Sequence, residues 1–220
     1  MMNSRILIWR HSLFLTCICL IPTGLKAEIL DHFPEQLNEE SKYIIYLHGR
    51  IIEDKGIRPT HPKFGVYEFE ALAISFAKAG YTVIRQVRKA NTKPQQYADY
   101  VSKQLRRYRS QSNTELNLVG FSKGGVITLL VSSQMNDTDI RYAILAACWQ
   151  SITKRDMDLS GHILSLHDLS DSVASCQPLA DKSNKIVDFH VRTFDTGKSH
   201  GLFFKPYPTW QKPLFEWLKR

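Results

Sequence analysis

Short β-rich runs alternate along most of this chain with stretches whose apolar residues recur at helical spacing. The run YIIYL at residues 43–47 is apolar on both faces, which is typical of a strand buried in a parallel sheet. Five more β-rich runs follow it along the chain. We expect strands over residues 43–47, 81–87, 115–119, 140–147, 162–167 and 186–194.

Helices are expected between and after these strands. Gly80 follows the first helical segment, as glycine often does at a helix end, and Pro94 precedes the second, where proline is tolerated. Residues 51–66 contain two glycines and two prolines and are expected to form a loop. The helices are expected over residues 67–79, 95–109, 124–135 and 208–219. Strands that alternate with helices predict a parallel sheet with helices on both faces.

The first 27 residues differ from the rest of the chain. Two arginines give a basic start, an apolar run covers residues 13–21, and Pro22 ends it. This order is typical of a secretory signal peptide, and the run is about half of the roughly 20 residues that a membrane span needs. We therefore expect a signal peptide over residues 1–27 and one domain over residues 28–220. The protein would be exported, periplasmic or secreted, with no stable membrane span after cleavage; an uncleaved anchor is the alternative.

The charge of the chain argues against nucleic acid as a partner. Residues 1–27 contain three of the 29 basic residues and no acidic residue, so cleavage would lower the net charge from +8 to +5. The basic residues are scattered apart from a cluster at residues 106–109, which is more typical of a solvated helix face than of a phosphate-binding patch. The histidines show no HExxH or other close-paired ligand spacing, so no metal site is expected.

The motif Gly120-Phe121-Ser122-Lys123-Gly124 carries the strongest chemical signal. It matches the G-x-S-x-G nucleophile elbow, in which a serine lies at a sharp turn from a strand into a helix. Glycines two residues to either side avoid collisions at that turn, and the helix N-terminus favours developing negative charge. An expected strand precedes the motif and an expected helix follows it. Ser122 is therefore the candidate nucleophile, and a glycine-rich turn with an incidental serine is the alternative.

A serine hydroxyl needs a base, and the base needs an acid that orients it. With the chain order Ser, acid, His, the base is expected after the last strand, where His200 lies in the segment GKSHG. The acid is expected after the preceding strand. There, Asp171 fits better than the runner-up Asp168, because a carboxylate further into the loop can turn back under the imidazole. Capping of a turn or helix is the alternative role for both aspartates.

Two backbone N–H groups are expected to stabilise the oxyanion that forms during acyl transfer. Lys123 follows the nucleophile and supplies one of them. The loop after the first strand supplies the other, which we assign to Arg50 with Gly49 as the second choice. A glycine at this place lets the backbone approach the substrate closely.

Four segments together resemble a known superfamily. YIIYLHGR, GFSKGG, LSLHDLSD and GKSHG are similar, in this order, to the four signature segments of the α/β-hydrolases, and the resemblance spans about residues 43–219. It implies a three-layer α/β/α sandwich with a mostly parallel sheet, and ester, thioester or related acyl-transfer chemistry without a cofactor. Because only about 49 residues separate Ser122 from Asp171, no large cap domain is expected.

The resemblance implies a serine hydrolase that cleaves a carboxylic ester or related acyl bond of a small molecule through an acyl-enzyme on Ser122. The alternatives are an acyltransferase that uses the same residues and a non-catalytic binding protein that kept the fold. The resemblance also implies that Cys148 and Cys176, the only cysteines after residue 27, lie at the edge of the sheet where active sites form. A disulfide between them would hold the loop of Asp171, and two buried free thiols are the alternative.

Overall fold

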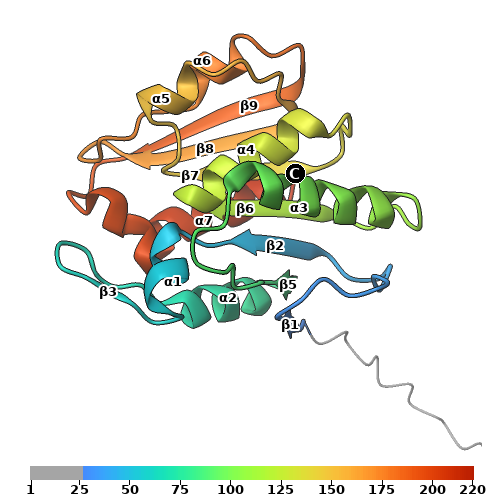
Figure 1. Cartoon of the computed structure of the whole chain (residues 1–220), viewed down its shortest axis with the longest axis horizontal. Coiled ribbons are helices and arrows are strands. Elements are labelled where there is room, and N and C mark those ends of the chain that lie inside the picture. The colour runs from blue at the N-terminus through green and yellow to red at the C-terminus, as the bar shows by residue number, and fades with distance from the viewer. Residues whose placement is uncertain (1–26) are drawn as a thin grey trace, which may run out of the picture.

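A seven-stranded parallel sheet forms the centre of the molecule in our computed structural model, which describes residues 27–220 (Figure 1). The strand order is β1-β5-β2-β6-β7-β8-β9, and every neighbouring pair is parallel. The strands are β1 (Ile29–Leu30), β2 (Tyr43–Leu47), β5 (Thr82–Ile84), β6 (Leu116–Phe121), β7 (Arg141–Leu145), β8 (Ser160–Asp168) and β9 (Lys185–Phe194). All six expected strands occur, and β1 adds a short seventh. The expected signal peptide falls on residues 1–26, outside the described residues, apart from its last position.

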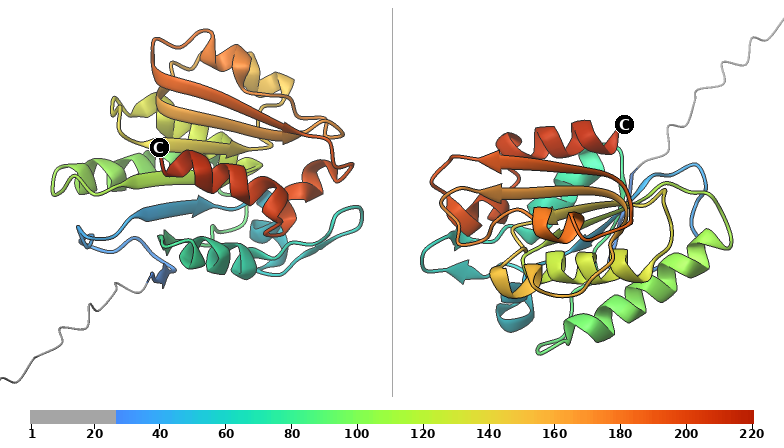
Figure 2. Two further views of the ribbon diagram at one scale, coloured as in Figure 1. Left: turned by 180° about the vertical axis from the view of Figure 1, so that it is seen from behind. Right: turned by 90° about the horizontal axis from the view of Figure 1, so that it is seen from above.

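Helices cover both faces of the sheet (Figure 2). On one face lie α3 (Pro94–Arg109) and α4 (Lys123–Gln134), and on the other lie α2 (Phe69–Lys78) and α7 (Pro208–Leu218). These four helices match the expected ones to within two residues at each end. The molecule is therefore a three-layer α/β/α sandwich, and residues 27–220 contain no cap domain.

The apolar run of β2 explains why the sheet is covered twice. Ile45 and Leu47 pack into the core beneath α3 and α4, whereas Ile44 and Tyr46 pack into the core beneath α2 and α7. Successive side chains of a strand point to opposite faces, so a strand that is apolar at every position needs a helical layer on each side.

Residues 51–66 are not the simple loop that was expected. α1 (Arg50–Lys55) begins directly after the loop that follows β2, and β3 (Thr60–His61) pairs antiparallel with β4 (Gly65–Val66) in a small hairpin. Three other short elements were also not expected: α5 (Gln150–Thr153), α6 (Gln177–Ala180) and the 3-10 helix η1 (Ser199–Phe204). Elements of two to six residues contain too few periods for a hydrophobic pattern to reveal them.

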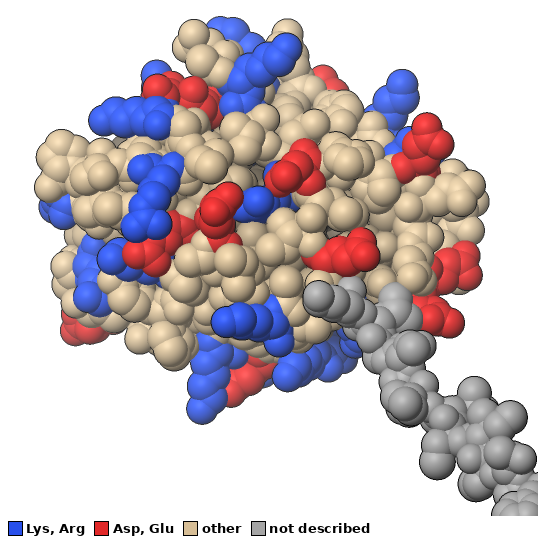
Figure 3. All heavy atoms as spheres, turned by 90° about the horizontal axis from the view of Figure 1, so that it is seen from below, with Lys and Arg blue, Asp and Glu red and all other residues tan. Residues whose placement is uncertain are grey.

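Arginines of the cluster at residues 106–109 bind neighbouring segments of the chain. Arg107 donates a hydrogen bond to the carbonyl of Pro34, and the Arg109 Nε lies 2.7 Å from a carboxylate oxygen of Asp137. The face of the molecule in Figure 3 carries Lys and Arg side chains interspersed with Asp and Glu. None of the helices within residues 27–220 is long and apolar enough to cross a membrane.

Because the strands are parallel, their C-terminal ends lie at one edge of the sheet, on the left in Figure 1. The loops after β2, β6, β8 and β9 all leave the sheet there, and α1 and η1 lie beside them. Segments that are far apart in the sequence are thus brought to one rim.

Candidate active site

Ser122 lies between the end of β6 and the start of α4, in a conformation that L-amino acids rarely adopt. Its backbone angles are φ 55° and ψ −118°. Such a conformation costs about 1–3 kcal/mol and persists only where the surroundings fix it. The Ser122 N–H donates to the carbonyl of Leu145 at 2.9 Å, and the Ser122 carbonyl accepts from the N–H of Val126 at 3.0 Å. These bonds hold the serine at the rim of the sheet.

The glycines around Ser122 are required by close backbone packing. A Cβ atom on Gly124 would lie 1.8 Å from the carbonyl oxygen of Leu47, and one on Gly120 would lie 2.2 Å from the hydroxyl of Thr128. Neither distance is tolerable for non-bonded atoms. The first turn of α4 therefore packs directly against the end of β2, which only glycine allows.

His200 and Asp171 approach each other from two different loops. His200 lies in η1 after β9, and its Nδ1 lies 2.7 Å from the Oδ2 of Asp171 in the loop after β8. The Asp171 side chain is 4% exposed and that of His200 is 17% exposed. Because Nδ1 is bound to the carboxylate, Nε2 is the nitrogen that remains to accept a proton.

Ser122 and His200 line the same cavity, which has a volume of about 360 Å³. The aromatic rings of His200 and Phe121 lie 4.8 Å apart, which places the imidazole beside the residue that precedes the serine. Within residues 27–220 no hydrogen bond joins the hydroxyl of Ser122 to the imidazole. Contacts of this kind are often long before substrate binds and tighten in the complex.

Asp168 and Asp171, the two candidates for the acid, have different hydrogen-bond partners in the structure. The carboxylate of Asp168 is fully buried and accepts hydrogen bonds from both the N–H and the hydroxyl of Ser170 and of Thr196, at 2.5 to 3.0 Å. Burial alone would raise the pKa of Asp168, but these four bonds outweigh it and hold the pKa below its usual value. Asp168 thus ties the loop after β8 to the loop after β9, whereas Asp171 contacts the imidazole.

The loop after β2 passes directly beside the serine. A Cβ atom on Gly49 would lie 3.6 Å from the Cβ of Ser122. Arg50 is the first residue of α1 and Lys123 is the first residue of α4, so the N–H groups of both lie in a first helical turn, where no intrahelical acceptor exists. Gly49 and Arg50 line the cavity that contains Ser122.

A buried network of charges, which the sequence did not reveal, connects this loop to the serine turn. The Oε1 of Glu53 in α1 accepts from the Arg88 Nε at 2.7 Å, and its Oε2 binds the ammonium group of Lys123. The side chains of Glu53 and Arg88 are wholly buried. Arg88 also donates to the carbonyl of His48. We call these four residues the Glu53 network. The two cations that bind Glu53 lie 35 and 70 positions from it along the chain, so no local pattern could have found the network.

His48 is held neutral within this network. Its Nε2 accepts the N–H of Arg88 at 3.0 Å, so that nitrogen carries no proton. Burial, followed by the charge of Arg88, lowers the pKa of His48 to about 3. His48 is therefore uncharged at neutral pH and supports the loop after β2.

Aromatic side chains form much of the cavity wall. Phe64 projects from the β3–β4 hairpin, stacks on His61 with the rings 4.5 Å apart, and lies 5.6 Å from the ring of Phe204. Phe64 also lies 6.1 Å from the ring of His200. The segment that was expected to be a loop thus builds one side of the candidate site.

The comparisons with known proteins bear on the fold. No protein-family model matches the chain, and no curated protein matches it. Among solved structures, an esterase from Exiguobacterium antarcticum superposes with a TM-score of 0.55 at 15% identity over 82% of this chain and 92% of its own. The mouse α/β-hydrolase domain-containing protein 10 gives a TM-score of 0.54 at 13% identity over 83% and 90%.

The chain has the α/β-hydrolase fold. Both neighbours match nearly their whole length, which accords with a small sandwich that carries no cap domain. At identities of 13% and 15%, the likeness concerns the fold alone.

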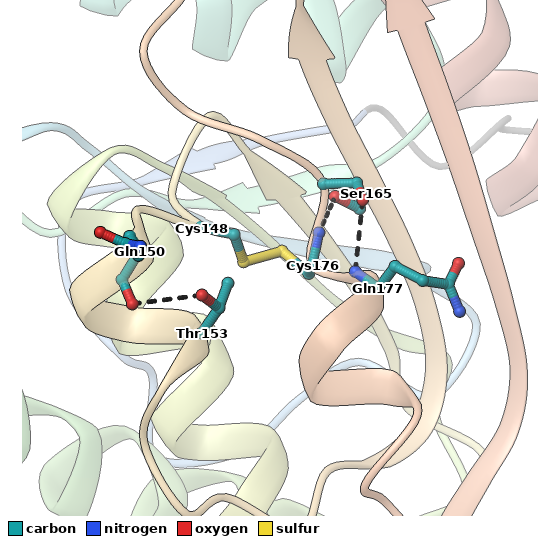
Figure 4. Close-up of a disulfide and its surroundings, with 7 residues drawn as sticks. Cys148, Gln150, Thr153, Ser165, Cys176 and Gln177 are labelled. Atoms are coloured by element: carbon teal, nitrogen blue, oxygen red, sulfur yellow. Dashed lines mark hydrogen bonds between the residues drawn. A yellow bond between two sulfur atoms is a disulfide. The ribbon is translucent and has the colours of Figure 1, made fainter.

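Cys148 and Cys176 are joined by a disulfide near the C-terminal edge of the sheet of this α/β-hydrolase fold (Figure 4). Cys148 follows β7 and pairs with Ala174 in an isolated bridge, and the N–H of Cys176 donates to the hydroxyl of Ser165 on β8 at 3.0 Å. The bond therefore fastens the loop that begins beside Asp171. Within residues 27–220, no group of three or more His, Cys, Asp and Glu side chains is arranged to hold a metal ion.

Proposed function

We propose that this protein is a serine hydrolase that cleaves a carboxylic ester or a related acyl bond through an acyl-enzyme on Ser122. The observation that carries the proposal is a strained serine at the start of a helix that shares a cavity with His200, whose other ring nitrogen lies beside the carboxylate of Asp171. Activation of a serine hydroxyl requires a base that is itself oriented by a third group, and His200 with Asp171 meets this requirement.

The proposed reaction has two steps. The Nε2 of His200 takes the proton of the Ser122 hydroxyl as its oxygen attacks the acyl carbonyl, and the leaving group departs with that proton. Water then attacks the acyl-enzyme, with His200 taking its proton; the bond between the acyl carbon and the Ser122 oxygen breaks, His200 returns the proton to that oxygen, and the acid leaves. Asp171 keeps the imidazole oriented and stabilises its charged form.

The N–H groups of Lys123 and Arg50 are proposed to bind the oxyanion of each tetrahedral intermediate. Support comes from the place of both residues at the first turns of helices beside Ser122. Removal of one such donor typically costs about 3–4 kcal/mol of transition-state stabilisation. The Glu53 network supports this role, because it links the helix that begins with Arg50 to the side chain of Lys123.

Replacement of the nucleophile tests the proposal. Ser122→Ala should abolish turnover of 4-nitrophenyl acetate and labelling by a fluorophosphonate probe, while circular dichroism shows an intact fold. Ser133→Ala, on the far end of the same helix, is the matched control and should retain both. Turnover by Ser122→Ala at the wild-type rate would refute the proposal. Products formed with added alcohols would distinguish transfer to an acceptor from hydrolysis.

Export is proposed on separate grounds. Disulfides persist in oxidising compartments and are rare in the cytosol, so the Cys148–Cys176 bond supports a site of action outside it. The N-terminal sequence of the protein purified from its native compartment should begin after residue 27. Retention of residues 1–27 would contradict cleavage.

A further inference from the structure

Ser122 borders two cavities of different chemistry. The first is the cavity described above, which we call the aromatic cavity because Phe64, Phe121 and Phe204 line it. Its charged lining residues are Arg50, Lys55 and Asp54, so it includes a carboxylate. The second has a volume of about 570 Å³ and is lined by Ser122 together with Val126 and Trp149; we call it the basic cavity. Its charged lining residues are Arg50, Lys93, Lys123 and Arg155, and no acidic residue lines it.

Three of these cations are available to a ligand. Lys93 and Arg155 are exposed, and neither forms an ion pair within residues 27–220. Arg50 lies 3.1 Å from Asp54, but both side chains are largely exposed, and such surface pairs contribute little. The arginine can therefore turn toward an anion.

The fourth cation that lines the basic cavity is Lys123. Lys123 is bound to Glu53, yet the same carboxylate also neutralises the buried Arg88, so two cations share one anion. One positive charge remains uncompensated beside the cavity, and because the side chain of Lys123 is only 16% exposed, salt screens this charge less than a fully exposed one. The potential in the basic cavity is therefore positive even where lysine and glutamate are paired.

Two helix starts reinforce this potential. α3 begins at Pro94, directly after Lys93, and α4 begins at Lys123, and all three residues line the basic cavity. Helix N-termini carry a partial positive charge that falls off within the first turn, so it adds to the side chains rather than replacing them.

We propose that the basic cavity binds a carboxylate or phosphate group of the substrate, while the aromatic cavity holds its apolar or aromatic part. This inference rests on the proposed hydrolase function. Because Ser122 lies on the wall of both cavities, the scissile carbonyl is held between them. The substrate class is then an ester or thioester that is apolar on one side of the acyl bond and anionic on the other.

The test uses three 4-nitrophenyl esters whose acyl chains have equal length and end in a carboxylate, a phosphonate or an uncharged methyl ester. We expect kcat/KM for at least one anionic ester to exceed that for the uncharged ester by about tenfold, since each surface cation contributes up to roughly fivefold. The preference should shrink as sodium chloride is added. Whichever anionic ester is favoured identifies the anion.

The double variant Lys93→Gln/Arg155→Gln should reduce this ratio to about twofold. Lys78→Gln/Arg220→Gln removes the same charge away from both cavities and should keep the wild-type ratio. Equal turnover of all three esters by the wild type, or an unchanged ratio in the first variant, would overturn the basic-cavity proposal. Since turnover of the uncharged ester and its loss in Ser122→Ala are measured in parallel, failure of the hydrolase function itself would be seen separately.

Discussion

Two His–Asp pairs in this molecule have almost the same contact geometry but very different surroundings. In one, the Nδ1 of His200 lies 2.7 Å from the Oδ2 of Asp171, and in the other, the Nδ1 of His162 lies 2.6 Å from the Oδ2 of Asp188. His162 and Asp188 face each other across β8 and β9 near the starts of these strands. His200 and Asp171 lie in the loops at their ends.

A His–Asp contact alone does not make a candidate active site. The strands are parallel, so the starts and ends of β8 and β9 lie at opposite edges of the sheet. Of the two histidines, only His200, at the C-terminal edge, lines a described cavity together with Ser122. Burial also differs, because the side chain of Asp188 is 41% exposed and that of Asp171 is 4% exposed. The buried carboxylate holds its imidazole with less competition from water.

The largest expected effect follows directly from this comparison. Asp171→Asn should lower kcat for a simple activated ester by about 10⁴-fold, because the amide cannot hold the imidazole in the required tautomer or stabilise its charged form. Asp188→Asn should change kcat by less than about twofold, because its histidine lies at the opposite edge of the sheet. Steady-state kinetics of both variants at pH 7.5 measures the contrast. Equal effects of the two substitutions would contradict the assignment of the acid.

A third carboxylate, that of Glu53, is expected to affect the free energy of unfolding. Glu53 is more buried than Asp171 and binds two cations, so Glu53→Gln leaves Arg88 and Lys123 without their partner. We expect the free energy of unfolding to fall by about 3–5 kcal/mol. Asp31→Asn removes an exposed partner of Arg85 and should change it by no more than about 1 kcal/mol.

Urea denaturation followed by tryptophan fluorescence measures both variants. If Glu53→Gln does not fold, the conservative Glu53→Asp, which keeps the charge and shortens the side chain, should show an intermediate loss. Unfolding free energies that are equal in Glu53→Gln and Asp31→Asn would show that the buried network does not stabilise the loop after β2.

The smallest expected effect is the loss of stability in acid that follows from the buried, neutral His48. The pKa of His48 is about 3 in the folded protein and 6.5 in the unfolded chain. Between pH 3 and pH 6.5, therefore, only the unfolded chain binds a proton at this imidazole. The contribution of neutral His48 to stability is complete above pH 6.5 and is lost as the pH falls toward 3, by about 1.4 kcal/mol per pH unit.

Unfolding free energies at pH 7.5, 6.0 and 5.0 measure this slope. The slope should be shallower in His48→Gln than in the wild type, while the exposed His32→Gln should leave it unchanged. The same slope in His48→Gln and in the wild type would mean that other groups cause the acid sensitivity.

Much of the fold was predictable because its signals are local. Strands such as residues 43–47 are apolar at every position, and helices such as residues 95–109 have a regular period, so each could be recognised within its own segment. The hairpin that carries Phe64 could not, since its strands have two residues each and owe their place to contacts with η1.

For the candidate site, the sequence determined by itself which chemical groups are available and where the chain must turn: the glycines around Ser122, the candidate pair of aspartates and the histidine after the last strand. The tertiary structure decided which aspartate binds hydroxyl and amide donors and which contacts His200. It also decided that Glu53 lies between Arg88 and Lys123. The reason is physical: turns and periods depend on neighbours within a few residues, whereas partners for buried charges are chosen by the packing of distant segments at one rim of the sheet.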